Sequence, residues 1–530
     1  MKLVTAAQMR EIDRHAIVDL KIPGMVLMEN AGRGVARCAQ RVLRGLGGTT
    51  VHVVAGRGNN GGDGFVVARH LQNWGFDAGV TLLAVASDLR GDAAANHQIC
   101  AAMGITIRER PDLTSPGSLR EHLSGAHVVI DGILGTGITG EVRGPARAAI
   151  EALGGIPKER IVAIDIPSGI DSDTGQVLGA AVNAGHTVTF GLPKIGLYQY
   201  PGAGYAGEVI VQEISLPRAE LTSDRLPIHL TIREDVAGWL PRRPPDAHKG
   251  FCGRVFIVAG SVGMTGAAAM AGMAALRAGA GLVTVGVPAS LNDVLEVKLT
   301  EVMTKPLPEC ADRTLSLAAE EPILEMAEEA EACVIGPGLS LAEETQELVR
   351  RLIIQIDRPL VIDADALTAL SERTQALTGR SAPTVLTPHP GEMSRVVGQP
   401  IDAIQSDRVS AALEAARVLN SVVLLKGAGS VSAAPDGTVY VNATGNAGMA
   451  SGGTGDVLAG LLGGFLGQGM PALEAAAAAA YVHGLAGDLA AAESQRALVA
   501  GDMLDALPRA FAEAEAGPSA EGAAHEGRGA

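Results

Sequence analysis

The sequence predicts an α/β protein in which two units follow one another, each with a sheet between two layers of helices. The chain has 530 residues, more than one ordinary domain contains. Strand-like and helix-like segments alternate in two separate series, and such alternation is typical of parallel sheets covered on both faces. A proline-rich stretch at residues 216–250 separates the two series. We therefore predict two three-layer αβα domains with a boundary near residue 220.

The composition fits two large buried cores. Hydrophobic residues make up 47% of the chain and charged residues 19%, which excludes general disorder. Aromatic residues make up only 3%, and the net charge is −16 without a basic stripe. These values argue against base stacking and against attraction to polyanions, so we expect neither nucleic acid nor membrane as a partner.

Several features predict a cytoplasmic protein. The cysteines have no paired spacing, which is typical of reduced thiols. They are Cys38, Cys100, Cys252, Cys310 and Cys333. Residues 1–17 carry charges and lack an apolar signal core, and the longest apolar run, at 457–466, is too short to span a bilayer.

The first unit begins with two predicted helices. Thr5 to Gln8 form a capping-box pattern that opens a helix over residues 8–20, and a second helix is predicted over 26–43. A further helix is predicted over 65–74. Seven β-branched segments predict strands. They lie at residues 50–55, 80–85, 105–108, 127–131, 161–165, 187–190 and 209–214.

The second unit repeats the alternation with six predicted strands. These lie at residues 254–259, 282–287, 333–335, 360–363, 384–386 and 422–426. An alanine-rich helix is predicted over 472–492. From residue 511 almost no large apolar side chain remains, which predicts a disordered tail. The predicted domains are therefore 1–220 and 221–510, followed by a tail at 511–530.

Three strand ends of the first unit carry polar residues and glycines. Gly56 to Gly61 match the dinucleotide fingerprint, but the acidic residue expected after the next strand is missing, so a redox NAD pocket is doubtful. Because the carboxyl ends of parallel strands line one crevice, Asn60, Asp131 and Ser168 would offer oxygens to a hard cation. Asp165 would then be available for proton transfer. In the alternative interpretation, Asp131 and Asp165 only cap the turns that follow them.

A glycine-rich stretch at 442–460 dominates the second unit. A glycine loop that opens a helix presents backbone N–H groups to an anion, and Asp456 at that position suggests a base that accepts a proton from a hydroxyl. The alternative is a flexible turn capped by Asp456. Residues 426–430 follow a strand and predict either a nucleotide contact or a β-hairpin turn. No Gly-x4-Gly-Lys-Ser/Thr motif occurs, which excludes that class of nucleotide hydrolase.

These motifs resemble a known pair of fused enzyme domains. Met28-Glu-Asn-Ala-Gly32, Gly58-Asn-Asn-Gly-Gly-Asp-Gly64, Asp131-Gly-Ile-Leu-Gly-Thr-Gly137 and Asp165-Ile-Pro-Ser-Gly169 resemble the NAD(P)H-hydrate epimerase domain. The remainder, with Gly452-Gly-Thr-Gly-Asp456, resembles the ADP-dependent (S)-NAD(P)H-hydrate dehydratase. The resemblance covers nearly the whole chain except the linker and the tail. It implies a Rossmann-like first domain and a ribokinase-like second domain.

The resemblance also implies roles for individual residues. In the first domain, the potassium ligands would be Asn60, Asp131 and Ser168, and Asp165 would be catalytic. The contacts to the hydrated nucleotide would be Asn59, Asn60, Gly61, Gly62, Asp63, Gly135, Thr136, Gly137, Ile138, Thr139, Gly140, Glu141 and Asp165. In the second domain, Asp456 would be catalytic. The substrate contacts there would be Ala267, Gly338, His389 and Asp456, and the nucleotide contacts Lys426, Gly427, Ala428, Gly429, Ser430 and Gly455.

By the same resemblance, we expect a metabolite repair enzyme. It would interconvert the two C6 epimers of hydrated NADH or NADPH, and it would dehydrate the S epimer at the expense of ADP, with K⁺, and with Mg²⁺ accompanying ADP. We also expect a homo-oligomer. Two alternatives stay open: a ribokinase-like kinase for a vitamin precursor fused to a regulatory nucleotide-binding domain, or a first half that is a non-catalytic ligand sensor.

Overall fold

The computed structural model describes residues 1–371 and 373–516. The chain forms two compact units, the first at Lys2–Ile228 and the second from His229 onward together with Met1. The boundary thus lies eight residues beyond the predicted position at 220. It falls inside a short strand, β8 (Ile228–Leu230), which belongs to the sheet of the second unit.

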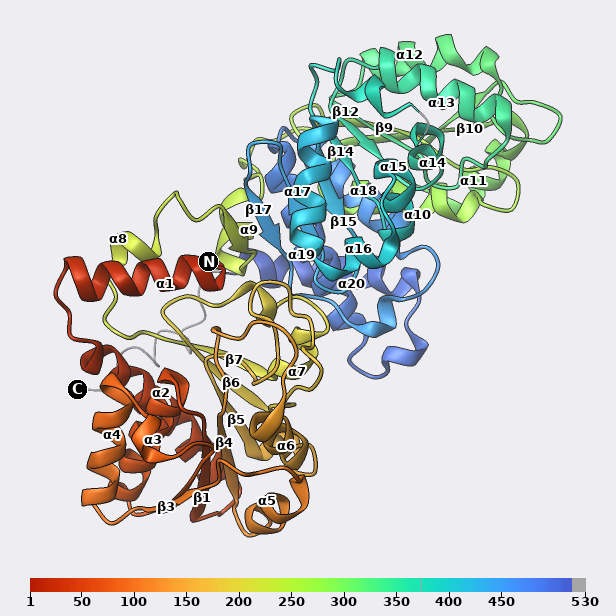
Figure 1. The fold of residues 1–530 in the computed structure, drawn as a ribbon. Helices are drawn as coiled ribbons and strands as arrows, with labels where there is room; N and C mark the ends of the chain where they lie inside the picture. The colour runs from red at the N-terminus through yellow and green to blue at the C-terminus, as the bar shows by residue number, and fades with distance from the viewer. Residues whose placement is uncertain (372, 517–530) are drawn as a thin grey trace. The chain divides into compact units, whose positions relative to one another are not determined.

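The sheet of the first unit has seven strands in the order β3-β2-β1-β4-β5-β6-β7, and every neighbouring pair is parallel (Figure 1). The strands are β1 (Thr50–Ala55), β2 (Asp77–Leu82), β3 (Thr106–Glu109), β4 (Val128–Gly132), β5 (Ile161–Ile164), β6 (His186–Phe190) and β7 (Glu208–Gln212). The helices are α1 (Ala6–Arg14), α2 (Gly24–Gly45), α3 (Asn59–Asn73), α4 (Gly91–Ala102), α5 (Pro116–Leu123), α6 (Gly144–Leu153), α7 (Gly202–Ala206) and α8 (Arg218–Leu221).

Alternate side chains of each strand enter two different cores, which confirms the three-layer prediction for this unit. Val51 and Val53 belong to one buried cluster with residues of α2 and α3. Val54 belongs to a second cluster with residues of α5 and α6. This follows from the two-residue period of a strand, which sends successive side chains to opposite faces. The predicted capping box of α1 is confirmed, but a π-helical segment, His15–Asp19, replaces the end of the predicted helix.

The sheet of the second unit has ten strands in the order β11-β10-β9-β12-β13-β14-β15-β16-β17-β8. Neighbouring strands pair in parallel along β11, β10, β9, β12, β13, β14 and β15. Strand β16 pairs antiparallel with β15 and with β17. The strands, besides β8, are β9 (Arg254–Val258), β10 (Leu282–Pro288), β11 (Met303–Leu307), β12 (Ala332–Ile335), β13 (Leu360–Ile362), β14 (Thr384–Leu386), β15 (Val422–Leu425), β16 (Val431–Ala433) and β17 (Val439–Val441).

Helices pack against this sheet in the second unit (Figure 1). They are α9 (Arg233–Trp239), α10 (Thr265–Arg277), α11 (Asn292–Lys298), α12 (Glu320–Glu328), α13 (Glu343–Gln355), α14 (Asp365–Leu370), α15 (Pro390–Val397), α16 (Ile401–Ser406), α17 (Arg408–Leu419), α18 (Thr454–Gly467), α19 (Ala472–Ala490) and α20 (Ala500–Glu515). A large buried cluster joins α10, α18, α19 and α20 to the sheet. Among the helices of the described residues, none combines the length and apolarity needed to cross a membrane.

The structure corrects two predictions and supports the hairpin alternative for residues 426–430. Four strands were not predicted, namely β8, β11, β16 and β17: three have only three residues, and β11 contains Pro306, which its edge position tolerates. Residues 426–430 connect the antiparallel strands β15 and β16, so they do form a hairpin connection. The predicted disorder from residue 511 is wrong up to Glu515, because the Phe511 ring packs edge-on against Phe465 at 6.0 Å. Residues 517–530 lie outside the described part.

Candidate active sites

The predicted residues of the first unit meet at the carboxyl ends of β1, β4 and β5. Asp131 lies in β4, Asp165 directly follows β5, and the loop after β1 leads into α3 at Asn59. A Cβ atom at Gly56 would collide with the Ile133 carbonyl oxygen, so a glycine is needed for the loops after β1 and β4 to approach this closely. That approach brings Asn60 beside the loop after β4.

Asp131, Ser168 and Asn60, the predicted cation ligands, share one hydrogen-bond network. The buried Asp131 carboxylate accepts from the Ser168 hydroxyl at 2.6 Å and from the Ser168 N–H at 2.8 Å. The Leu134 carbonyl accepts from Asn60 Nδ2 at 3.0 Å and from Ser168 Oγ at 3.0 Å. Carboxylate, hydroxyl, amide and carbonyl groups therefore converge here, and their oxygens are the ligands that hard cations prefer.

The charge of this network favours a cation. Burial raises the pKa of Asp131 to about 6, although hydrogen bonds from Ser168 and Ile133 partly oppose the shift. A bound cation would compensate that buried charge, so the residues present fit a potassium ion. The network contains one acidic residue, and no group of three His, Cys, Asp or Glu placed to hold a metal occurs among the described residues. The Asp131 side chain also accepts from the Ile133 N–H at 3.3 Å, so it stabilises its own turn as well.

Asp165 lies beside this network and is held by partners from outside its own turn. Its backbone has a φ of +65°, and its Oδ1 accepts from the Lys194 ammonium, from the Thr189 hydroxyl at 3.1 Å and from the Phe190 N–H at 3.3 Å. Lys194 is 1% exposed and also donates to Thr189 Oγ1 at 3.1 Å. All these donors come from β6 and the loop after it, so Asp165 is positioned by tertiary contacts. These partners do not fit the turn-capping alternative.

Two further carboxylates face the Asp165–Lys194 pair. Burial raises the pKa of Asp63 well above its usual value, and the nearby Asp165 and Asp13 carboxylates raise it further. Burial likewise raises the pKa of Asp13 to about 6, although Lys194 opposes the shift. Sequence reasoning identified Asp63 and Asp165 but missed Asp13 and Lys194. Lys194 follows the carboxyl end of β6, where ligand-binding residues of such sheets are expected, so the sequence could have indicated it. Asp13 lies within α1, and no sequence pattern indicated its role.

The loop at residues 135–141 is largely exposed and lies at the carboxyl end of β4, before α6 begins at Gly144. Gly135 lies next to Asn60, because a Cβ atom at position 135 would be 3.3 Å from Asn60 Cγ. Glu141 forms exposed ion pairs with Arg143 at 3.4 Å and Arg147 at 3.9 Å. The loop thus borders the Asn60 network and presents its central residues to solvent.

In the second unit, Asp456 is the third residue of α18, after Gly453 with a φ of +96°. Acidic residues at this position commonly accept from the backbone N–H of the residue that precedes the helix. Glu392 in α15 and Asp502 in α20 do so, at 2.8 Å and 2.9 Å. Within the described residues, the Asp456 side chain forms no such hydrogen bond. It therefore does not cap α18, and the capping alternative has no support from the contacts.

A buried charge network surrounds Asp456. Lys426 Nζ donates to Asp363 Oδ1 at 2.7 Å and lies 3.8 Å from Glu392 Oε2. The same ammonium would be 3.6 Å from a Cβ atom at Gly455, so it lies beside the start of α18. Burial, together with the Asp363 carboxylate, raises the pKa of Asp456 to about 7, although Lys426 opposes the shift. Burial alone would lower the pKa of Lys426, but the Asp363 and Glu392 carboxylates outweigh it and raise that pKa.

The hairpin loop that carries Lys426 is tightly ordered. The Ser430 hydroxyl donates to the Gly427 carbonyl at 2.9 Å, and the Gly427 N–H points back to Ser430 Oγ at 3.3 Å. The buried Arg408 guanidinium donates to the Lys426 carbonyl at 3.1 Å, and burial lowers the pKa of this Arg to about 10. Residues 427–430 are partly or fully exposed, as nucleotide contacts must be. Sequence reasoning missed Arg408 and Asp363, although Asp363 also ends a strand.

The remaining predicted substrate contacts lie on other loops of this unit. A Cβ atom at Gly338 would be 3.0 Å from Ala267 Cβ, so these two positions are in contact. His389 caps α15, since its Nδ1 accepts from the N–H groups of Gly391 at 2.9 Å and Glu392 at 3.2 Å. Its side chain stays 53% exposed, so the ring also faces solvent. The structure thus gives His389 a structural role beside the predicted one.

Comparisons with known proteins match both units. A family model described as NAD(P)H-hydrate dehydratase matches residues 255–509, and one described as YjeF-related protein N-terminus matches residues 24–196. The chain is 45% identical over 522 residues to the bifunctional NAD(P)H-hydrate repair enzyme of Moorella thermoacetica, covering 96% of each chain. It is 42% identical over 512 residues to the enzyme of the same name from Thermofilum pendens, again covering 96% of each.

A solved structure was also matched. It is the ADP/ATP-dependent NAD(P)H-hydrate dehydratase of Bacillus subtilis co-crystallised with ATP and Mg²⁺, 34% identical, with a TM-score of 0.48. The match covers 54% of this chain and 99% of that one.

Proposed function

The chain belongs to the family of bifunctional NAD(P)H-hydrate repair enzymes, and we propose how its two sites divide the reaction. The protein is an epimerase and a dehydratase for hydrated NAD(P)H: it interconverts the R and S forms and returns the S form to NAD(P)H. The alternatives of a vitamin-precursor kinase and of a non-catalytic first half find no support in relatives that match the full length of the chain. The observation that carries the proposal for residue roles is the uncapped Asp456 carboxylate beside Lys426 and Asp363.

We propose that Asp165 and Lys194 carry the epimerisation. C6 of the hydrate bears a hydroxyl group and is bonded to the ring nitrogen N1. Removal of the hydroxyl proton would break the C6–N1 bond to give an aldehyde while N1 takes up a second proton, and re-closure on the other face with return of both protons would invert C6. Asp165 would exchange that proton, because its carboxylate follows a strand at the edge where ligands bind in such sheets. Lys194 would orient the carboxylate through the hydrogen bond to Oδ1. Asp13 and Asp63, whose pKa values are raised, would supply or store the second proton.

We propose that Asn60, Asp131 and Ser168 hold potassium. When bound, the ion would supply positive charge against the phosphates of the substrate in an acidic protein. The loop residues 135–141 and Asn59 to Asp63 would hold the remainder of the hydrated nucleotide. Support comes from the convergence of Asn60 and Gly135 at the carboxyl ends of β1 and β4.

For the dehydration, we propose that Asp456 removes the proton from the C6 hydroxyl as that oxygen attacks the β-phosphorus of ADP. The new O–P bond forms while the bond to the AMP oxygen breaks, and AMP leaves. Loss of phosphate from C6 and of a proton from C5 then restores the ring double bond. A pKa of about 7 suits a general base that works near neutral pH, and the N–H groups at the start of α18 would stabilise the transferring phosphoryl group.

The other predicted residues complete this site. Residues 426–430 and Gly455 would contact the nucleotide, and Lys426 would also position Asp363 and the start of α18. Ala267, Gly338 and His389 would line the side of the hydrated substrate. Mg²⁺ would enter with the phosphates of ADP as part of the co-substrate. ADP is proposed as the phosphoryl donor in preference to ATP.

Cellular location and assembly also belong to this proposal. All five cysteines are free thiols, which fits a reducing cytoplasm. We propose a homo-oligomer, and sedimentation analysis tests it. The experiment for the function is to incubate the protein with hydrated NADH and ADP and to follow the absorbance of reduced nicotinamide. Recovery of absorbance from the S form alone, or no recovery, would contradict the bifunctional assignment.

A further inference from the structure

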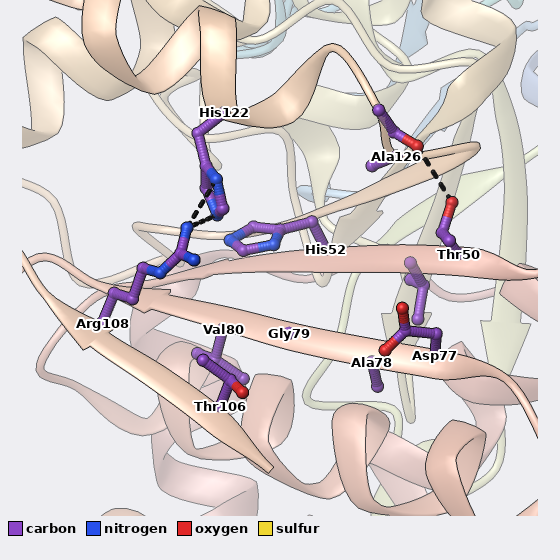
Figure 2. Close-up of a pocket in the computed structure, with 12 residues that line it drawn as sticks. Thr50, His52, Asp77, Ala78, Gly79, Val80, Thr106, Arg108, His122 and Ala126 are labelled. Atoms are coloured by element: carbon purple, nitrogen blue, oxygen red, sulfur yellow. Dashed lines mark hydrogen bonds between the residues drawn. The ribbon is translucent and has the colours of Figure 1, made fainter.

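The first unit has a pocket at the end of its strands that the proposed activity does not use. This cavity of about 260 Å³ lies where β1, β2 and β3 begin, whereas Asp131 and Asp165 lie where β4 and β5 end (Figure 2). It is lined by Thr50, Val51, His52, Asp77, Ala78, Gly79, Val80, Thr106, Arg108, His122, Gly125 and Ala126. The cavity and the Asp131–Asp165 site therefore lie at opposite ends of the strands of one sheet.

The cavity exists because part of one sheet face has small or polar residues. His52, Gly79 and Thr106 stand side by side in the register of β1, β2 and β3, and Thr81 pairs with Arg108 in the next such row. Gly79 has no side chain, so His52 can lie over β2, and a Cβ atom at position 79 would be 3.1 Å from its Nδ1. Over this part of the face, α5 places the His122 ring in place of an apolar side chain.

One end of the cavity holds one guanidinium group and two imidazole rings. Arg108 Nη1 lies 2.6 Å from His122 Nδ1 and 2.9 Å from its Nε2. The His122 ring stands edge-on to the His52 ring, with 4.6 Å between centroids, and the three side chains point toward one another in Figure 2. His52 Nε2 is 2.9 Å from Thr81 Oγ1. Among the described residues, no carboxylate forms an ion pair with Arg108.

Arg108 carries the positive charge of this cluster, and its hydrogen-bond partner is the His122 ring. Burial lowers the pKa of His122, and the Arg108 and Arg110 guanidinium groups lower it further. Burial, His122 and Arg108 lower the pKa of His52 to about 3. The carboxylate that lines the cavity, Asp77, lies at the other end, near Thr50 (Figure 2). A guanidinium beside an imidazole offers the planar, charge-assisted donors that oxyanions prefer.

We propose that this pocket binds a small phosphate-class oxyanion beside the paired Arg108 and His122 side chains. The volume, about 260 Å³, is below the range of roughly 300–1,000 Å³ typical of pockets for drug-sized ligands, so it suits inorganic phosphate or a small phosphate monoester. The Asp77 end would accept a hydrogen bond from a hydroxyl group of such an ester. This inference does not depend on the residue roles proposed for the two reactions.

The test uses the full-length protein and inorganic phosphate at constant ionic strength. Histidine ring signals are followed by NMR while phosphate replaces chloride. Bound phosphate should shift the signals of His122 and raise its pKa, because an adjacent anion favours the imidazolium form. Because the readout is His122 itself, phosphate bound in the dehydratase site does not interfere. The groups that face His122 and contribute to its titration are Arg108, Arg110 and His52.

Arg108→Gln should weaken the phosphate affinity about tenfold or more, since one charge-assisted contact is lost. Arg108 is exposed, so this variant should fold, and its melting temperature checks that. Arg41→Gln is the matched control, because Arg41 is also exposed but pairs with Glu208 at 2.9 Å outside the pocket. A second titration with glycerol 2-phosphate distinguishes the sources: tighter binding identifies a monoester, and equal or weaker binding identifies free phosphate.

The proposal is overturned if the His122 signals do not respond to high millimolar phosphate. It is equally overturned if Arg108→Gln and Arg41→Gln respond as the unmodified protein does, because the shift would then reflect a general salt effect. In either case the Arg108–His122 contact only covers the buried His52 and Thr81 side chains of this sheet face.

Discussion

Replacing Asp456 by Asn should abolish the dehydration and leave the epimerisation unchanged. Asn keeps the size of the side chain and loses its basicity, and the loss of a general base typically costs about 10²–10⁴-fold in rate. No cap is lost with it, since the Asp456 carboxylate accepts no hydrogen bond from the residues that begin α18 within the described part of the chain. ADP should bind as well or slightly tighter, because repulsion between the carboxylate and the phosphates is relieved.

The pH dependence of the dehydration rate of the unmodified protein tests the role of Asp456 independently. Burial and Asp363 raise the pKa of Asp456 to about 7, so the carboxylate is protonated below that pH and can accept no proton. The dehydration rate should therefore fall about tenfold per pH unit as the pH drops from 7 and should level off above it. The same raised pKa means that Asp456 favours the folded state least at high pH, where its buried charge must form.

Both rates are measured on one preparation, with ADP affinity as a check of folding. Asp502→Asn is the matched control: Asp502 is also the third residue of its helix, but it caps that helix by accepting from the Val499 N–H at 2.9 Å. This control should lose up to about 1 kcal/mol of stability and little activity. If dehydration by Asp456→Asn stays within a few fold of the unmodified rate, the assignment of Asp456 as the base is refuted.

Three further predictions concern the first unit and the domain boundary. Epimerisation should be faster in potassium than in tetramethylammonium, and Asp131→Ala should remove that difference; equal rates in both salts would contradict a potassium site. Lys194→Gln should slow epimerisation at least about 10²-fold, because Asp165 loses its main donor, while dehydration by the same variant reports whether it folds. An unchanged epimerisation rate would exclude Lys194 from the reaction. Fragments 1–226 and 227–530, which are cut before β8 so that this strand stays whole, should each fold with its own activity, because the units are separately compact. Circular dichroism and rate measurements check this, and two unfolded fragments would contradict it.

The layers of the fold could be predicted from the sequence, because buried side chains repeat about every two residues in a strand and about every 3.6 residues in a helix. Val51, Val53 and Val54 in one β-branched run are enough to expect a strand buried on both faces, and the two cores confirm it. Three-residue strands such as β16 and β17 are too short to show a period, so they were missed. The end of α20 was missed because its alanines carry little apolar surface, although Ala510 and Ala514 are fully buried.

The candidate site residues that could be predicted from the sequence are those that follow strands or lie in glycine loops. Asp131, Asp165 and Asp456 stand at positions that a local pattern marks. Asp13 comes from a helix far away in the chain, and only the three-dimensional packing places it near Asp165. The pairing of Lys426 with Asp363, across 63 positions, was not predicted for the same reason.

Both candidate sites contain one lysine and several aspartates, but the lysine pairs with a different aspartate in each. In the first, Lys194 donates directly to Asp165, and the raised pKa values belong to the neighbouring Asp13 and Asp63. In the second, Asp363 accepts a hydrogen bond from the ammonium of Lys426, and burial together with the Asp363 carboxylate raises the pKa of Asp456 to about 7. An epimerase must return the proton that it removes. Several carboxylates around one lysine can share that proton. A phosphoryl-transfer base needs one carboxylate with a pKa near the working pH. We propose that burial of Asp456, with the Asp363 carboxylate nearby, provides it.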